Sequence, residues 1–211
     1  GIVEALESVY DMDALVAEGV PDFKLFTAYP GVFFSDDGAI FRAMQQTARN
    51  GGLIMMHAEN GMAIDVVAAQ TFENGTTDPI GHGLARKAVF EGEATNRAIQ
   101  IAHIAGAPLY VVHVTCKESV DAIAAARAKN WPVWGETCTQ YFFIDTTFLE
   151  RPNFEGAKYV YTPPPREKAN QDVLWNAVRT DVLSAISTDH CASLWDGQKS
   201  LGKDDFSKIP N

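Results

Sequence analysis

Cysteine, basic side chains and long apolar runs are all scarce in this chain of 211 residues. The cysteines at positions 116, 138 and 191 lack zinc-finger spacing, and so few thiols are typical of a reducing cytoplasm. Lysine and arginine total 17 against 27 acidic residues, a net charge of -10 that argues against nucleic acid or an anionic membrane as the main partner. No apolar run approaches the ~20 residues of a membrane span, and no signal peptide is visible after Gly1.

Repeats, low-complexity tracts and interdomain linkers are also missing, and two kinds of segment alternate instead. The sequence predicts strands at 22–27, 53–57, 109–114, 132–137 and 184–190. Apolar residues at helical spacing predict helices at 1–19, 36–51, 62–73, 92–106, 117–130 and 166–180, with a long connection over 74–90. This alternation favours an α/β fold with a parallel sheet covered by helices. About five strands suffice for an open sheet, whereas a closed barrel of about eight strands needs more units.

A lysine stands inside the otherwise apolar strand of "DFKLFTAYPG" (22–31). A buried ammonium loses its hydration and tends to lose its charge, so Lys24 either extends to the mouth of the strand or is chemically changed. Considered alone, the first interpretation is the simpler one. In the second, carbon dioxide adds to the neutral amine and gives a carbamate, whose two oxygens can bridge two divalent ions.

Three other polar residues, His57, His113 and Asp189, lie near the carboxyl ends of predicted strands. In parallel α/β folds these ends converge on one face, so we expect the three side chains to meet Lys24 there. Histidine and carboxylate ligands suit zinc and neighbouring transition metals, and two such ions can activate water and polarise a carbonyl. Either histidine alone would more simply be a core residue, and Asp189 alone a helix cap. Their combination favours a metal site.

Motifs spread over nearly the whole chain carry a resemblance to a known family: "DFKLFTAY", "MMHAENG", "EGEATNRAI", "LYVVHVTC", "GETCTQY", "EGAKYVYTPPPREK", "STDHC" and "DFSKIPN". The chain resembles the dihydropyrimidinase and D-hydantoinase (cyclic amidase) branch of the amidohydrolase superfamily. The resemblance implies a (β/α)8 TIM barrel, of which this chain covers about strands 4 to 8. It also implies that residues 1–211 are a single catalytic-barrel segment of a longer enzyme. The family's HxH strand and its C-terminal part are then absent from this chain.

The resemblance implies a bridged site for two divalent metal ions, most simply Zn²⁺. Lys24 would be the carboxylated lysine that bridges the ions, and His57 and His113 would bind the more exposed one. Asp189 would bind the other ion and serve as general base and proton shuttle. Two ligands of that ion are the histidines of the family's HxH motif, and no HxH sequence occurs in this chain.

The resemblance also implies substrate-binding residues. Tyr29 would donate a hydrogen bond to the oxyanion, and Thr162 and Asn211 would hold the ring amide, largely through backbone groups. Phe33 and Phe34 follow in the loop after Tyr29, and our hypothesis is that they contact the substituent of the substrate ring. Packing beneath the loop is an equally good interpretation of these two rings.

The implied reaction is the metal-dependent opening of 5,6-dihydropyrimidines and 5-substituted hydantoins to N-carbamoyl amino acids, as in pyrimidine degradation. The implied protein is a cytoplasmic homotetramer whose partner is a small cyclic amide. Allantoinase or dihydroorotase is an alternative, although no arginine stands out for the dihydroorotate carboxylate. A non-catalytic dihydropyrimidinase-like scaffold and an inactive fragment are two others. Ala192 and Pro165 depart from the family's usual proline and leucine, and both positions lie in loops.

Overall fold

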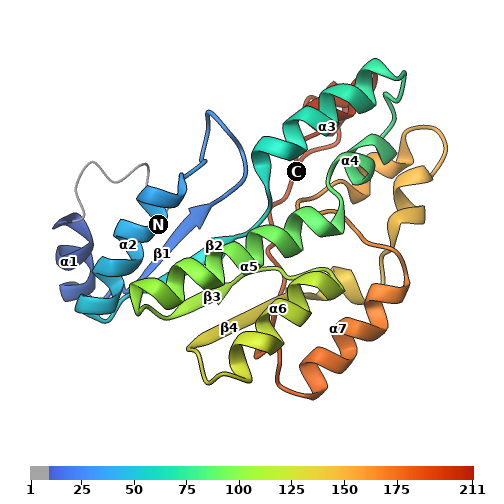
Figure 1. Cartoon of the computed structure of the whole chain (residues 1–211). Helices are drawn as coiled ribbons and strands as arrows, with labels where there is room; N and C mark the ends of the chain where they lie inside the picture. Colours follow the sequence, from blue (N-terminus) through green and yellow to red (C-terminus); the bar gives the residue numbers. More distant parts are fainter. Residues whose placement is uncertain (1–9) are drawn as a thin grey trace.

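The computed structural model describes residues 10–211, along which helices and parallel strands alternate (Figure 1). The strands are β1 (Asp22–Phe26), β2 (Leu53–His57), β3 (Leu109–Val111), β4 (Val133–Cys138) and β5 (Ala185–Ser187). The α-helices are α1 (Tyr10–Ala17), α2 (Asp37–Asn50), α3 (Gly61–Glu73), α4 (Ile80–Ala85), α5 (Ala88–Ala105), α6 (Lys117–Arg127) and α7 (Ala169–Arg179). Short 3-10 helices are η1 (Thr139–Phe142), η2 (Thr146–Glu150), η3 (Glu155–Tyr159), η4 (Lys199–Gly202) and η5 (Phe206–Lys208).

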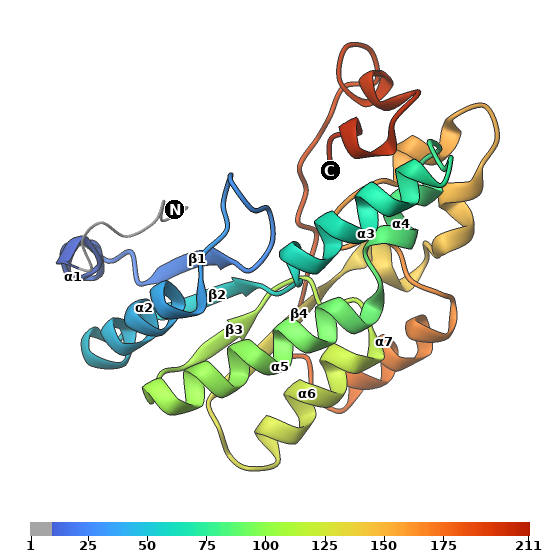
Figure 2. The ribbon, with the colours of Figure 1, turned by 45° about the horizontal axis from the view of Figure 1, so that its top comes forward.

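The strands form one parallel sheet in the chain order β1-β2-β3-β4-β5. Helices α2, α5, α6 and α7 lie in a row along one face of this sheet (Figure 2). Side chains alternate between the two faces of a strand, so every second residue enters the core beneath these helices. Phe23, Ile54 and Leu109 of the strands pack there with Met44 of α2 and Ile99 of α5, and all are at most 2% exposed. Lys24 therefore belongs to the opposite face of the sheet.

A smaller apolar cluster lies beyond the carboxyl ends of the strands. It joins α4 to the 3-10 helices and to the last residues of the chain through Ala85, Leu149, Val160, Phe206 and Ile209. In both ribbon views α3 and α4 lie beside the red segment that ends at Asn211 (Figures 1 and 2). This cluster brings the chain's last residues near the strand ends.

Within the described residues the predicted strands and helices are confirmed apart from their boundaries, but the predicted connection at 74–90 is wrong in part. The connection at 74–90 contains α4 and the first turn of α5, which starts at Ala88 rather than Gly92. Lys87 precedes α5 without a capping side-chain hydrogen bond, so the usual sequence signal for a helix start is missing. The strands predicted at 109–114 and 184–190 end at Val111 and Ser187, and the first nine residues of the predicted helix 1–19 lie outside the described residues. Among the helices of residues 10–211, none combines the length and apolarity that crossing a membrane requires.

Candidate active site

A cavity of about 440 Å³ opens where the strands end. It gathers residues from β1, β2, the loops after β3 and β5, the segment before α7, and the end of the chain. The predicted metal ligands and amide-binding residues line it: Lys24, Tyr29, His57, His113, Thr162, Asp189 and Asn211. Of the two rings expected to contact the substituent, Phe33 lines the cavity and Phe34 does not. The structure therefore brings the predicted set together around one space, although their chemical roles stay predictions.

Two of these residues follow their strands rather than lie on them. His113 and Asp189 come two residues after the last residues of β3 and β5. Their backbones turn into the left-handed region, with φ of 41° and 45°, and Tyr29 has φ of 61°. This region costs a non-glycine residue roughly 1–3 kcal/mol and is enriched at functional sites. At these three residues the backbone therefore turns sharply, at the edge of the cavity.

His57 and His113 form a close pair of buried imidazoles. Their ring centroids lie 4.5 Å apart and the rings are inclined at 71°, while each residue is only 3% exposed. Burial lowers the pKa of both rings, because a protonated ring would lack the hydration that stabilises its charge in water. Neutral imidazole is the form that binds metal ions.

Glu59, which the sequence reasoning missed, orients His57. Its Oε2 lies 2.8 Å from His57 Nε2 and 2.9 Å from Arg86 Nη1. Burial alone would raise the pKa of Glu59, but the Arg86 charge and the His57 hydrogen bond hold it well below its usual value. The ionised carboxylate only accepts hydrogen bonds, so His57 Nε2 carries the hydrogen and Nδ1 is the nitrogen left for a ligand.

Lys24 extends from β1 into the same cavity. Burial lowers the pKa of its ammonium, while the nearby carboxylates of Asp189 and Glu136 act in the opposite direction. A lowered pKa increases the neutral amine, which is the form that reacts with carbon dioxide. The local environment therefore suits the modification that the resemblance implies.

The donor set fits one side of a metal site. Within residues 10–211, no three His, Cys, Asp or Glu side chains are arranged to hold a metal ion by themselves. The neutral pair His57 and His113 supplies two nitrogen donors, and carboxylation would give Lys24 two anionic oxygens on the same cavity wall. The chemistry of these donors suits zinc, provided that Lys24 is modified.

The opposite side of the cavity is a chain of polar side chains. Tyr29 Oη donates to Asn211 Oδ1 at 3.2 Å, and Thr162 Oγ1 donates to the same oxygen at 2.6 Å. His82 Nε2 lies 3.1 Å from the Tyr161 carbonyl oxygen and 3.3 Å from Thr162 Oγ1. Because a carbonyl only accepts, His82 Nε2 carries the hydrogen. His82 thus contacts this polar chain without lining the cavity.

A second buried network supports the loop that carries His113. Arg166 Nη2 donates to Glu91 Oε2 at 2.7 Å, and its Nε donates to Thr115 Oγ1 at 2.8 Å. Arg166 and Glu91 are 6% and 3% exposed, so the two charges compensate each other away from water. The motifs "EGEATNRAI" and "TPPPREK" contain both residues, but a single sequence does not reveal that they are paired.

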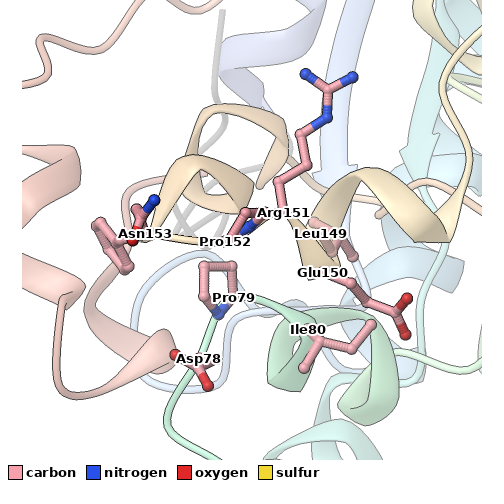
Figure 3. Close-up of a pocket in the computed structure, with 9 residues that line it drawn as sticks. Asp78, Pro79, Ile80, Leu149, Glu150, Arg151, Pro152 and Asn153 are labelled. Atoms are coloured by element: carbon pink, nitrogen blue, oxygen red, sulfur yellow. The ribbon is translucent and has the colours of Figure 1, made fainter.

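Another pocket, of about 290 Å³, lies between α4 and the segment from η2 to η3. In Figure 3 the Arg151 side chain extends away from Asp78 and Glu150, and Ile80 lies between these two carboxylates. None of the predicted metal or substrate residues lines this pocket. The cavity that contains Lys24 and the other proposed ligands is therefore the candidate active site.

Comparison with known proteins gives this cavity a family context. A D-hydantoinase of Streptomyces coelicolor is 58% identical over 205 residues, which are 97% of this chain and 44% of that relative. Along nearly its whole length the chain is similar to D-hydantoinases and dihydropyrimidinases. An Arabidopsis thaliana dihydropyrimidinase is 41% identical over 203 residues, which are 95% of this chain and 38% of that protein. The chain thus spans less than half the length of these relatives, and no family model matches it.

A solved structure extends the likeness to three dimensions. The dihydropyrimidinase from Brevibacillus agri NCHU1002 superposes with a TM-score of 0.98 at 46% identity, covering 100% of this chain and 46% of that one. The predicted fold class is confirmed: the parallel sheet and its helices are a segment of the amidohydrolase-type (β/α)8 barrel. In such a barrel the face of the sheet that carries Lys24 points inward.

Proposed function

We propose that this chain supplies the catalytic face of a metal-dependent cyclic amidase that opens dihydropyrimidine or 5-substituted hydantoin rings to N-carbamoyl amino acids. The observation that carries the proposal is the single cavity lined by Lys24, His57, His113 and Asp189 on one side and by the polar chain from Tyr29 on the other. The relatives' names, D-hydantoinase and dihydropyrimidinase, agree with this chemistry.

The proposed cofactor is a pair of divalent ions, most simply Zn²⁺, held by carboxylated Lys24 together with His57, His113 and Asp189. When bound, such a pair activates water and polarises the amide carbonyl. The Nε2–H of His57 donates to Glu59, which keeps Nδ1 free of hydrogen and therefore ready to serve as a ligand.

The side chains of this chain would handle the proton and the substrate. Asp189 accepts the proton of the attacking water and passes it to the ring nitrogen as that nitrogen leaves. Tyr29, which lines the cavity and donates to Asn211 Oδ1 in the structure, would turn its hydroxyl hydrogen to the oxygen that gains negative charge. Burial raises the pKa of Tyr29, so the hydroxyl keeps the proton that it donates. Thr162 and Asn211 hold the amide edge of the ring.

An assay of the purified protein with Zn²⁺ and bicarbonate tests the proposal. We expect dihydrouracil and a phenyl-substituted hydantoin to yield their N-carbamoyl amino acids. Asp189→Asn should lower kcat by about 10²–10⁴, as expected for loss of a general base. The control Asp196→Asn changes an exposed aspartate that does not line the cavity and should leave kcat unchanged. Absence of turnover of every cyclic amide by zinc-loaded protein would refute the proposal.

The alternatives predict different results in the same experiment. A dihydroorotase needs a cation for the substrate carboxylate. Among the described residues no arginine lines the cavity, and the ammonium of Lys199, which does, donates to two backbone carbonyls. Turnover of dihydroorotate or allantoin in preference to dihydrouracil would favour these enzymes. A scaffold or an inactive fragment would bind no zinc and would turn over none of the rings.

The resemblance supports further proposals about the whole protein. We propose a cytoplasmic homotetramer, which light scattering of the purified protein would test. We also propose that a longer polypeptide carries the HxH strand and a C-terminal part. Intact-mass measurement of the protein from its native source tests that division.

A further inference from the structure

We propose that Lys199 is a positioning residue that fixes the amide-binding side of the cavity by binding two backbone carbonyls at once. The inference rests on the proposed function, because Thr162 and Asn211 bind substrate only in that proposal. Lys199 lines the cavity, yet neither the sequence motifs nor the proposed chemistry gives it a task.

The contacts of Lys199 join two segments that are far apart in the chain. Its Nζ donates to the Val160 carbonyl oxygen at 2.6 Å and to the Pro210 carbonyl oxygen at 2.5 Å. Val160 stands two residues before Thr162, and Pro210 directly precedes Asn211. One ammonium therefore holds the backbone on both sides of the hydrogen bond between Thr162 and Asn211.

The surroundings of Lys199 favour this role over an ordinary surface charge. Within residues 10–211, Lys199 forms no ion pair with a carboxylate. Its charge is offset by the two carbonyl dipoles, and hydrogen bonds from a charged donor are shorter and stronger than neutral ones. The Lys199 ammonium is half-buried and uses its donors on backbone oxygens. It therefore restrains the positions of those oxygens rather than attracting a ligand.

The position of the two substrate residues depends on this restraint. Thr162 and Asn211 meet through a hydrogen bond of 2.6 Å, and Tyr29 joins the same Asn211 oxygen. Without Lys199, the segments at 160–162 and 209–211 would still share apolar contacts through Val160 and Ile209. They would lose the polar contact that sets the distance between their backbones. Substrate binding should therefore weaken more than the chemical step.

Steady-state kinetics of Lys199→Met on the zinc-loaded protein tests the inference. We expect KM for the cyclic amide to rise about tenfold, the effect of losing a charge-assisted hydrogen bond, while kcat changes less than about twofold. Lys199→Arg keeps a cationic donor and should restore most of the affinity. Lys203→Met removes an exposed lysine four residues away and should leave KM unchanged. Bound zinc should be equal in all these variants.

Hydrogen exchange separates failure of this inference from failure of the proposed function. The Val160 and Ile209 amides are hydrogen-bonded to Ala157 and Phe206, and both should exchange faster in Lys199→Met even if the protein turns over no cyclic amide. Unchanged exchange together with unchanged KM would overturn the positioning role. A fall in kcat at constant KM would also overturn it, because Lys199 would then act in the chemical step. If Lys199→Met does not fold, Lys199→Gln, which keeps a neutral donor, takes its place with the same readouts.

Discussion

Single side chains around the cavity differ mainly in how burial changes their charge. Burial lowers the pKa of Lys24, His57 and His113, which favours the neutral forms of these nitrogens on one wall. It raises the pKa of Tyr29, which keeps a donor hydroxyl on the other. The cavity thus separates groups suited to a metal from groups suited to a substrate oxygen.

His82 should make the stability of the protein depend on pH. Burial and the charges of Arg86 and Lys199 lower its pKa to about 3, against the opposing effects of Glu59 and the Tyr161 carbonyl. The unfolded chain binds this proton near pH 6.5, so the stability present above that pH is lost as the pH falls toward 3. We expect His82 to account for about 2 kcal/mol of lost unfolding free energy between pH 7 and pH 5.

Urea denaturation of His82→Asn at both pH values measures this contribution. The variant should be less stable at pH 7, because it loses the contact with the Tyr161 carbonyl, but its stability should change less between the two pH values. The control His103→Asn, at an exposed position, should keep the wild-type dependence. An equal change in unfolding free energy between the two pH values for His82→Asn and wild type would contradict this role of His82.

Phe33 should influence the choice of ring substituent. It lines the cavity, is 41% exposed and stacks on Phe26 at 5.3 Å between ring centroids. Phe34 does not line the cavity, and its backbone pairs with that of Phe26 in a β-bridge. Phe33→Ala should change the ratio of kcat/KM for a phenyl-substituted hydantoin over dihydrouracil about threefold to tenfold, the range expected for one aromatic contact. Phe34→Ala should change it less, and an unchanged ratio in Phe33→Ala would count against this role.

The meeting of the proposed metal ligands at the cavity could be predicted, whereas the residues that support the site could not. Lys24, His57, His113 and Asp189 stand near strand ends, and parallel strands bring such positions together. Glu59 and Lys199 act through contacts that depend on tertiary structure, the second with carbonyls 39 and 11 residues away. Backbone carbonyls have no signature in the sequence, so the two hydrogen bonds of Lys199 can be recognised only in the folded chain.

Among the elements, the short helix α4 shows how local packing sets a boundary. Its sequence, "IGHGLA", has two glycines and no helical period of apolar residues, which explains why it was predicted as part of a connection. A methyl group on Gly81 would lie 2.3 Å from a ring carbon of Phe206 in η5. Helix α4 forms because tertiary contacts outweigh its weak propensity.

Gly81→Ala should therefore destabilise the contact between α4 and η5. Phe206 is 2% exposed and has little room to move, so we expect a loss of about 1–3 kcal/mol in unfolding free energy, as for other overpacked cores. Gly83→Ala in the same helix is the matched control. Its added methyl would meet only the end of the Leu149 side chain, at 2.9 Å, and helix propensity favours alanine. Urea denaturation of both variants checks the difference, and equal stabilities would refute it.

For the molecule as a whole, the alternation of strands and helices was sufficient to predict one parallel sheet. It left the choice between an open sheet and a barrel segment undecided, because five strands suit both, and the resemblance made that choice. Helices cover one face, while Trp134 and Ile186 on the sheet remain 39% and 46% exposed.

Zinc should stabilise the whole protein if the proposed site exists. A ligand that binds only the folded state at a hundred times its dissociation constant adds about 2.7 kcal/mol, or roughly 5–10 °C in Tm for a chain of this size. We expect this rise with Zn²⁺ and bicarbonate, and its reversal by a chelator, in thermal scans. The double variant His57→Asn and His113→Asn should not respond, whereas His103→Asn should respond like wild type. An unchanged Tm of the wild-type protein on addition of zinc would contradict the proposed metal site.

The left-handed backbones at Tyr29, His113 and Asp189 have a consequence for anyone who evolves this protein in the laboratory. Glycine fits such conformations without strain, so a screen that rewards heat resistance alone would tend to enrich glycine at these positions. Each variant enriched in this way would lose a side chain on which the proposed chemistry depends. Selection for robustness should therefore be coupled to selection for turnover from the first round.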